Sequence, residues 1–268
     1  MARKIAFTKM QGAGNDYIYV NTRIYPLTQP EELARRWSAP HTGIGADGLV
    51  LIEPSETADF RMRIFNSDGS EAQMCGNASR CIGKYVYEKG LTRKELLRLE
   101  TKAGIKELHL QVKDGRVESV TVDMGQPVLG AEEEIEAGGH LWKGRIASMG
   151  NPHFVIRVEQ VEALDLHAFG PLIEHDPLFP ERTNVEFVER LSDDELRVRV
   201  WERGSGITLA CGTGACATAA VMIKAGLCHN PVRVKMDGGD LDIRWEQGSG
   251  HLFKTGPAAF VFEGETTI

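Results

Sequence analysis

The sequence predicts an α+β protein made of two copies of one fold, each rich in strands and holding one prominent helix. Short runs in which apolar and polar residues alternate dominate the chain, as in half-buried antiparallel strands. Two longer segments, 78–89 and 214–225, have a helical pattern and each is followed by a glycine suited to a helix C-terminus. These two segments are related by one constant offset in residue number, the same that separates Cys75 from Cys211.

The remaining elements are short and are bounded by Gly, Asp and Asn turns. Shorter helices are expected at 30–37 and 165–174. Strands are expected at 5–9, 16–20, 49–53, 60–66, 106–112, 117–123, 153–158, 184–188, 196–202, 232–236, 241–245 and 259–263. We therefore expect an N-terminal lobe at 1–122 and a C-terminal lobe at 123–268, with the option that the last strand returns to the first lobe.

An internal repeat supports this division. Few residues are identical between the copies, but the identities fall on turns and on cysteines. The offset between Cys75 and Cys211, called the repeat offset below, aligns Gly14-Asn15 with Gly150-Asn151, Cys75-Gly76 with Cys211-Gly212, Gly90-Leu91 with Gly226-Leu227, and Phe65-Asn66 with Trp201-Glu202.

Composition excludes several classes of function. The chain has 31 Lys and Arg against 38 Asp and Glu, a net charge of −7, so its surface repels nucleic-acid backbones. Its longest mostly apolar segment, 216–223, is too short to span a bilayer, and the N-terminus resembles no signal peptide. We expect a cytoplasmic protein that binds neither nucleic acid nor membrane.

The five cysteines are an odd number, which argues against a disulfide framework. The spacings of Cys75 to Cys81 and of Cys211 to Cys216 do not fit the two-residue ligand spacing of structural zinc sites. We therefore expect no structural zinc site, and most of these thiols to be buried as small apolar groups.

One cysteine in each copy lies directly before the prominent helix, in Met74-Cys75-Gly76-Asn77 and in Ala210-Cys211-Gly212-Thr213. A helix start presents unpaired N–H groups and a partial positive charge, and so binds anions such as a carboxylate. The pKa of a thiol there is expected to fall from about 8.5 towards roughly 3.5–7.5. Because two Cys-Gly pairs occupy equivalent repeat positions, a shared functional role outweighs simple burial.

Two thiols that flank one carbon can invert its configuration. One thiolate removes the α-proton from one face, and the opposite thiol delivers a proton to the other face. The helix N–H groups would stabilise the carboxylate as it takes on enolate character. Other polar candidates are the equivalent Asn15 and Asn151, the dipeptide Glu202-Arg203, which could bind the charged ends of an amino acid, and His153.

Two glycine-rich segments offer a nicotinamide-dependent alternative. The segment 43–48 fits G-x-G-x-x-G but leads into a strand, so its context is wrong. The segment 212–217 fits G-x-G-x-x-A, opens a helix, and is followed by Asp237 after the next strand. The first copy lacks these glycines and the surrounding segments alternate as in antiparallel sheets, which argues against a dinucleotide fold.

Eight motifs, in order along nearly the whole chain, closely resemble those of the diaminopimelate epimerases, pyridoxal-independent two-cysteine epimerases. They are Gly12-Ala13-Gly14-Asn15-Asp16, Gly43-Ile44-Gly45-Ala46-Asp47-Gly48, Phe65-Asn66-Ser67-Asp68-Gly69-Ser70, Met74-Cys75-Gly76-Asn77-Ala78-Ser79-Arg80-Cys81, Met149-Gly150-Asn151-Pro152-His153, Arg182-Thr183-Asn184, Trp201-Glu202-Arg203-Gly204 and Ala210-Cys211-Gly212-Thr213-Gly214.

The resemblance implies two lobes, each a mostly antiparallel β-barrel-like sheet around a central helix, with the substrate in a cleft between them. It implies Cys75 and Cys211 as the acid–base pair, with His153 and Glu202 acting on their protonation. Backbone N–H groups of Gly76, Asn77, Gly212 and Thr213 would hold the reacting carboxylate, and Asn15, Asn66, Asn151, Asn184, Glu202 and Arg203 would bind the rest of the substrate. It also implies a homodimer that needs no cofactor.

The chain departs from the family at Gly48, where many members carry Gln, so a contact to substrate is lost there or supplied by another group. Proline racemases and hydroxyproline epimerases share the two-cysteine plan and are the alternative. They typically have a histidine where this chain has Asn77, and they lack the Asn-Pro-His segment. We therefore expect interconversion of LL- and meso-diaminopimelate.

Overall fold

The computed structural model describes residues 3–268, which divide into two compact units. The first unit comprises the chain up to Val122 together with Gly256–Ile268, and the second comprises Asp123–Thr255. The last strand therefore belongs to the first unit, the option that the sequence left open for 259–263. Within the described residues, no helix is both long and apolar enough to cross a membrane.

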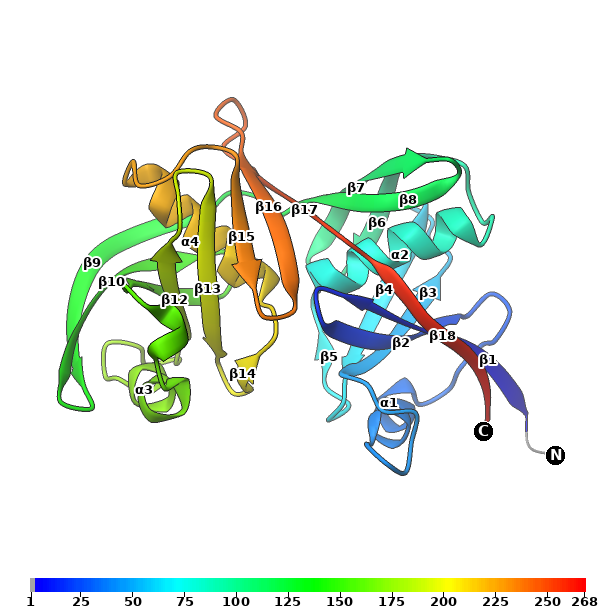
Figure 1. Cartoon of the computed structure of the whole chain (residues 1–268). Helices are drawn as coiled ribbons and strands as arrows, with labels where there is room; N and C mark the ends of the chain where they lie inside the picture. Colours follow the sequence, from blue (N-terminus) through cyan, green and yellow to red (C-terminus); the bar gives the residue numbers. More distant parts are fainter. Residues whose placement is uncertain (1–2) are drawn as a thin grey trace. The chain divides into compact units, whose positions relative to one another are not determined.

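The first unit holds two helices and a set of mostly antiparallel strands (Figure 1). Its elements are β1 (Lys4–Gly12), β2 (Asn15–Asn21), α1 (Pro30–Ser38), β3 (Gly48–Glu53), β4 (Phe60–Asn66), β5 (Glu71–Ala72), α2 (Gly76–Glu88), β6 (Leu96–Thr101), β7 (Gly104–Lys113), β8 (Arg116–Asp123) and β18 (Ala259–Thr267). Of these strands, β5 and β6 were not predicted.

The second unit repeats this series. Its elements are β9 (Val128–Ala137), β10 (His140–Ser148), β11 (Pro152–Arg157), a single 3-10 turn (Val161–Ala163), α3 (Leu166–Glu174), β12 (Asn184–Arg190), β13 (Glu195–Glu202), β14 (Gly206–Thr208), α4 (Gly212–Lys224), β15 (Val232–Met236), β16 (Gly239–Trp245) and β17 (Leu252–Gly256). Here β9, β10, β14 and β17 were not predicted.

The repeat holds at the level of strand register. Helices α3 and α4 begin and end one repeat offset after α1 and α2. In the parallel pair β2–β3, Ile18 lies opposite Leu49, and in β11–β12 their repeat counterparts Phe154 and Val185 lie opposite each other. The remaining pairings match as well, with β18 on β1 in the first unit and β9 on β10 in the second. The predicted pair of similar α+β lobes is confirmed.

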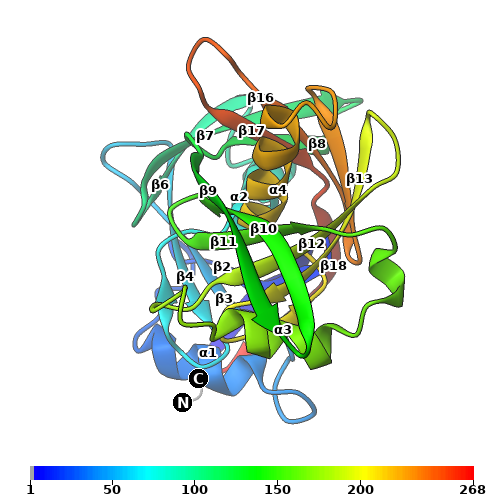
Figure 2. The ribbon, with the colours of Figure 1, turned by 90° about the vertical axis from the view of Figure 1, so that its left-hand side faces the viewer.

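The prominent helix of each unit is enclosed by strands. Helix α2 packs against β1, β2 and β7, and α4 packs against β10, β11, β12, β15 and β16 (Figure 2). Nine of the thirteen residues of α4 are buried, which explains why its sequence is apolar on nearly every side. Each helix ends as predicted, with Gly90 and Gly226 at positive φ. A buried helix fixes its own N-terminus firmly, and that is where each cysteine lies.

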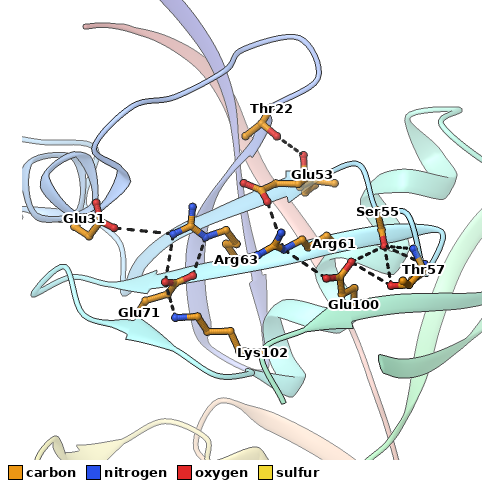
Figure 3. A network of polar contacts seen from close by, with 12 residues as sticks. Thr22, Glu31, Glu53, Ser55, Thr57, Arg61, Arg63, Glu71, Glu100 and Lys102 are labelled. Carbon is orange, nitrogen blue, oxygen red and sulfur yellow. Dashed lines mark hydrogen bonds and ion pairs between the residues drawn. The ribbon is translucent and has the colours of Figure 1, made fainter. Parts of the chain in front are cut away.

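Arginines on equivalent strands stabilise the outer faces of the sheets. Arg63 on β4 forms a two-pronged ion pair with Glu71, which also binds Lys102, and Arg61 lies between Glu53 and Glu100 (Figure 3). The guanidinium of Arg63 lowers the pKa of Glu71. In the second unit the equivalent arginines on β13 pair with other acids, Arg197 with Glu162 and Asp237 and Arg199 with Asp237. These pairs hold β4 and β13 in place, and each of these strands ends at a predicted site residue, Asn66 or Glu202.

Candidate active site

Both candidate thiols are helix N-cap residues. Cys75 precedes α2 and Cys211 precedes α4, each with extended backbone, which confirms the predicted cysteine at each helix start. The N–H groups in the first turn of a helix have no partner within the helix. Those of Gly76 and Asn77 in the first unit, and of Gly212 and Thr213 in the second, are therefore placed to receive an anion.

The Cys211 thiol is enclosed by polar groups of its own helix. Its Sγ accepts a hydrogen bond from Gly214 N at 3.3 Å and lies 3.4 Å from Thr213 Oγ1, and the residue is only 5% exposed. A side chain at position 214 would collide with the thiol, because a Cβ there would lie 3.2 Å from Cys211 Sγ and 2.6 Å from Glu186 Oε1. Glycine at this position therefore leaves room for the Cys211 thiol and the Glu186 carboxylate.

Cys211 is not acidified, so the expectation of a lowered pKa at the helix start is wrong for this residue. Burial raises the pKa of Cys211 well above its ordinary value, and the carboxylates of Glu202 and Glu186 raise it further. Hydrogen bonds from Thr213 and Gly214 N favour the thiolate but are outweighed. In the absence of substrate, Cys211 holds its proton at neutral pH.

Behind Cys211 lies a chain of buried polar contacts. His153 Nδ1 is 2.7 Å from Glu186 Oε1, with both side chains fully buried, and His153 Nε2 is 3.1 Å from Asn151 Oδ1. Asn151 Nδ2 in turn donates to Thr213 Oγ1 at 3.3 Å. The chain of contacts thus runs from Glu186 through His153, Asn151 and Thr213 to the thiol.

Each ring nitrogen of His153 therefore has one polar partner, Glu186 at Nδ1 and Asn151 at Nε2. These contacts fix the orientation of the imidazole behind the Cys211 site.

Glu202, at the end of β13, faces the same thiol. Its carboxylate lies close enough to Cys211 for each group to act on the pKa of the other, and it accepts a hydrogen bond from Thr208 Oγ1 on β14. Burial raises the pKa of Glu202, Glu186 adds to the increase, and the Thr208 bond and His153 oppose it. The predicted pair His153 and Glu202 therefore lies around Cys211.

The turn that carries Arg203 is held by hydrogen bonds to the buried side chains of Asn184 and Glu174. Asn184 Oδ1 accepts from Arg203 N at 3.0 Å, and Asn184 Nδ2 donates to the Pro152 carbonyl at 2.7 Å. Glu174, only 3% exposed, accepts from Gly204 N and from Trp201 Nε1. Arg203 itself donates to the Glu181 carbonyl and its side chain is exposed. The predicted Asn184 thus supports this turn through its side-chain oxygen.

The Cys75 thiol has a different environment. It is half-buried, and its Sγ donates to Asn15 Oδ1 at 3.4 Å. The same oxygen lies 3.5 Å from Asn77 Nδ2, and Asn15 Nδ2 donates to Asp47 Oδ2 at 2.6 Å. The predicted residues Asn15 and Asn77 therefore lie beside the predicted thiol, held by hydrogen bonds to each other.

A buried arginine orients Asn77. Arg80 is fully buried, and its Nη1 donates to Asn77 Oδ1 at 2.9 Å while its Nε donates to the Pro257 carbonyl at 3.1 Å. The Asn77 oxygen is thereby engaged, and its nitrogen is turned towards Asn15.

Asn66 and Gly48 face each other across β3 and β4. Asn66 Nδ2 donates to Ser70 Oγ at 3.0 Å, so its side chain belongs to the turn after β4. A Cβ at Gly48 would lie 2.0 Å from the Phe65 carbonyl oxygen, and therefore no side chain fits on this backbone. The departure at Gly48 is thus explained by packing.

Sequence reasoning missed Glu186, Arg80 and Thr208. Arg80 lies within the Cys75 motif, which was an available signal, whereas Glu186 and Thr208 reach the site only through the packing of β12 and β14. The dinucleotide alternative is not supported, since Asp237 after β15 pairs with Arg197 and Arg199.

The chain is similar to known proteins over its whole length. A family model described as diaminopimelate epimerase matches residues 7–130 and 145–261. Diaminopimelate epimerase from Phocaeicola vulgatus is 61% identical over 277 residues, covering 99% of both chains, and that from Parabacteroides distasonis is 60% identical over 265 residues, covering 98% of both. A phenazine biosynthesis protein of Bacillus anthracis shares the fold, with a TM-score of 0.77 at 18% identity over 99% of this chain and 100% of that one. The protein belongs to the diaminopimelate epimerase family.

Proposed function

We propose that this protein interconverts LL- and meso-2,6-diaminopimelate by proton transfer at one α-carbon, as a step of lysine biosynthesis. The observation that carries the proposal is the pair of cysteine N-caps at equivalent positions of the repeat, Cys75 on α2 and Cys211 on α4. Relatives that are 60 and 61% identical over nearly the full length bear this activity in their names.

The reaction needs one thiolate and one thiol. In one direction the Cys75 thiolate removes the α-proton and the Cys211 thiol delivers a proton to the opposite face. The electron pair left by the C–H bond is held as an enolate of the carboxylate until the new C–H bond forms. Each turnover leaves the proton on the other cysteine, so the reverse reaction uses the same groups with roles exchanged.

The remaining site residues divide by task. N–H groups of Gly76, Asn77, Gly212 and Thr213 bind the reacting carboxylate as its charge increases. His153 and Glu202 influence the protonation of Cys211, with Asn151 linking His153 to Thr213 by hydrogen bonds. Asn15, Asn66, Asn151, Asn184, Glu202 and Arg203 bind the remainder of the substrate. No metal or cofactor has a part in this scheme.

Proton NMR in D₂O tests the proposal with reduced protein and LL-diaminopimelate. We expect loss of the α-hydrogen signal together with appearance of the meso isomer. Cys75→Ala and Cys211→Ala are each expected to reduce turnover by at least about a thousandfold, while Cys228→Ala, outside the site, retains it. Absence of exchange in verified reduced protein would refute the diaminopimelate assignment, and proline and hydroxyproline would then be the next substrates.

We also propose a homodimer in the cytoplasm. The exposed apolar residues Val261 and Phe262 on β18, 52 and 44% exposed, support a self-association surface. Two thiols that must stay reduced to transfer protons suit a reducing compartment. Light scattering should give twice the mass of the chain, and Phe262→Glu should give the single-chain mass. A wild-type protein at the single-chain mass would exclude the dimer.

A further inference from the structure

Tyr17 on β2 occupies, in the first unit, the position that His153 occupies in the second. The two residues are separated by the repeat offset, and the strand registers agree. His153 lies opposite Asn184 in β11–β12, and the register of β2–β3 places Tyr17 opposite Gly48, the repeat counterpart of Asn184. Tyr17 is therefore the structural counterpart of the histidine that serves Cys211.

The Tyr17 side chain reaches Cys75 directly. Its hydroxyl lies close enough to the Cys75 sulfur and to the Asn15 side chain for both groups to act on its pKa, and the residue is only 6% exposed. The ring passes over Gly48, where a Cβ would lie 3.0 Å from Tyr17 Cε1. The glycine that departs from the family pattern thus leaves space for this ring.

The contacts at Cys75 provide one partner for each protonation state. When Cys75 is a thiol, its S–H donates to Asn15 Oδ1 at 3.4 Å. When it is a thiolate, the sulfur can only accept, and the Tyr17 O–H is the donor beside it. Burial and the Cys75 sulfur raise the pKa of Tyr17 well above its ordinary value, so the phenol keeps the hydrogen that it donates.

We propose that Tyr17 is a positioning residue for the reaction, whose hydroxyl stabilises and orients the Cys75 thiolate. The inference rests on the proposed two-thiol function and adds to it a group that acts through Cys75. Other ionisable groups around this thiol lie on β2, on α2 and in the loop before β3: Asp16, Tyr19, Asp47, Arg80 and Cys81.

The test is iodoacetamide labelling of Cys75, followed by peptide mass spectrometry across a pH series, in wild type and in Tyr17→Phe. Near neutral pH we expect labelling of Cys75 to slow by about ten-fold in the variant, the effect of losing one hydrogen bond to a charged group. At strongly alkaline pH, where the thiol ionises without help, the two rates should converge. Labelling of Cys211 in the same digests should be unchanged.

The matched control is Tyr19→Phe. Tyr19 lies two residues along the same strand, is 1% exposed, and burial followed by the Cys81 sulfur, rather than Cys75, has the largest effects on the pKa of its hydroxyl. We expect this variant to leave Cys75 labelling unchanged. Equal rates for wild type and Tyr17→Phe, or equal slowing in both variants, would overturn the proposal.

Kinetics give a second readout. In Tyr17→Phe, kcat/KM should fall by about ten-fold near neutral pH, by the same factor in both directions because the equilibrium constant is fixed, and should recover as pH rises. A purely structural defect would lower it at every pH. The labelling assay needs no substrate, so failure of the epimerase assignment would leave the Tyr17 result readable.

Discussion

Cys75 and Cys211 occupy the same position of the same fold, but the side chains around them differ in charge and in burial. Cys211 is buried and faces Glu202, with the His153–Glu186 pair behind it. The equivalent positions around Cys75 hold Asn66, Tyr17 and Val50, which are neutral. The duplicated backbone therefore places two thiols alike, while a few side-chain differences put carboxylates beside Cys211 and a phenol and an amide beside Cys75.

This difference assigns the resting protonation state. Acidic neighbours keep the proton on Cys211. At Cys75, the Asn15 oxygen accepts a hydrogen bond from the thiol, and the Tyr17 hydroxyl is the neighbouring donor for the thiolate. In the proposed two-thiol reaction, which begins with one thiol and one thiolate, this asymmetry would favour Cys211 as the thiol.

The largest effect on stability is expected when the buried Glu186 near Cys211 loses its partner His153. His153→Leu leaves Glu186 fully buried without its hydrogen-bond partner, and we expect a loss of about 3 kcal/mol or more in the free energy of unfolding. Tyr17→Phe, at the equivalent position of the first unit, should lower the free energy of unfolding by only about 1 kcal/mol. Urea denaturation of both variants measures the two free energies of unfolding. Equal losses would contradict the difference described between the surroundings of Cys211 and Cys75.

A second prediction concerns alkaline pH. Because the folded-state pKa of Cys211 is raised, the folded protein keeps a proton that the unfolded chain loses above about pH 8.5. Stability should therefore fall as pH rises above that value, by up to about 1.4 kcal/mol per pH unit for this group.

Urea denaturation at several pH values should show a shallower decline for Cys211→Ala than for wild type. Cys81, whose pKa burial raises to about 11, contributes in the same direction, so Cys81→Ala should flatten the curve as well. An unchanged slope in Cys211→Ala would mean that the thiol is not protonated as described.

Labelling without any mutation compares the two sites directly. Iodoacetamide should modify Cys75 at least about ten-fold faster than Cys211 near neutral pH, because Cys75 is half-buried whereas Cys211 is 5% exposed and protonated. Fully buried Cys81 serves as the internal reference for a thiol that reacts only on unfolding. Faster labelling of Cys211 than of Cys75 would contradict the conclusion that Cys211 is the protonated thiol.

The smallest effect is expected at Thr208. Its hydroxyl bonds to Glu202 and lowers the pKa of that carboxyl, so Thr208→Val should raise it. The acidic limb of the kcat/KM profile should move to higher pH by less than about one unit. Thr208→Ser, which keeps the hydroxyl, should behave like wild type, and identical profiles for Val and Ser would show that Glu202 does not govern this limb.

Much of this architecture is predictable from the sequence because the repeat and the periodicity are local signals. The two prominent helices were placed to within one turn at each end, and both N-cap cysteines were identified. The strand β9 escaped detection because it contains Glu132, Glu133 and Glu134 in succession, without the alternation of a half-buried strand.

Glu186 escaped for a different reason. In the segment Asn184–Arg190 it lies between Val185 and Phe187, as an outward-facing polar residue would, but β12 packs against both α4 and α3 and residues 184–188 are all buried. Both faces of the strand are therefore covered, and a carboxylate on either face becomes an internal group. Which side chains meet around a thiol depends on this packing, and no spacing along the chain encodes it.

The return of β18 to the first unit affects the order in which the protein can be completed during synthesis. Arg3 and Ile268 are joined by a reciprocal pair of backbone hydrogen bonds, both 3.0 Å, and β18 runs antiparallel along β1. The second unit, 123–255, is continuous in sequence and is fully translated first. The first unit, although most of it is made earlier, waits with the edge of β1 uncovered until residues 256–268 leave the ribosome.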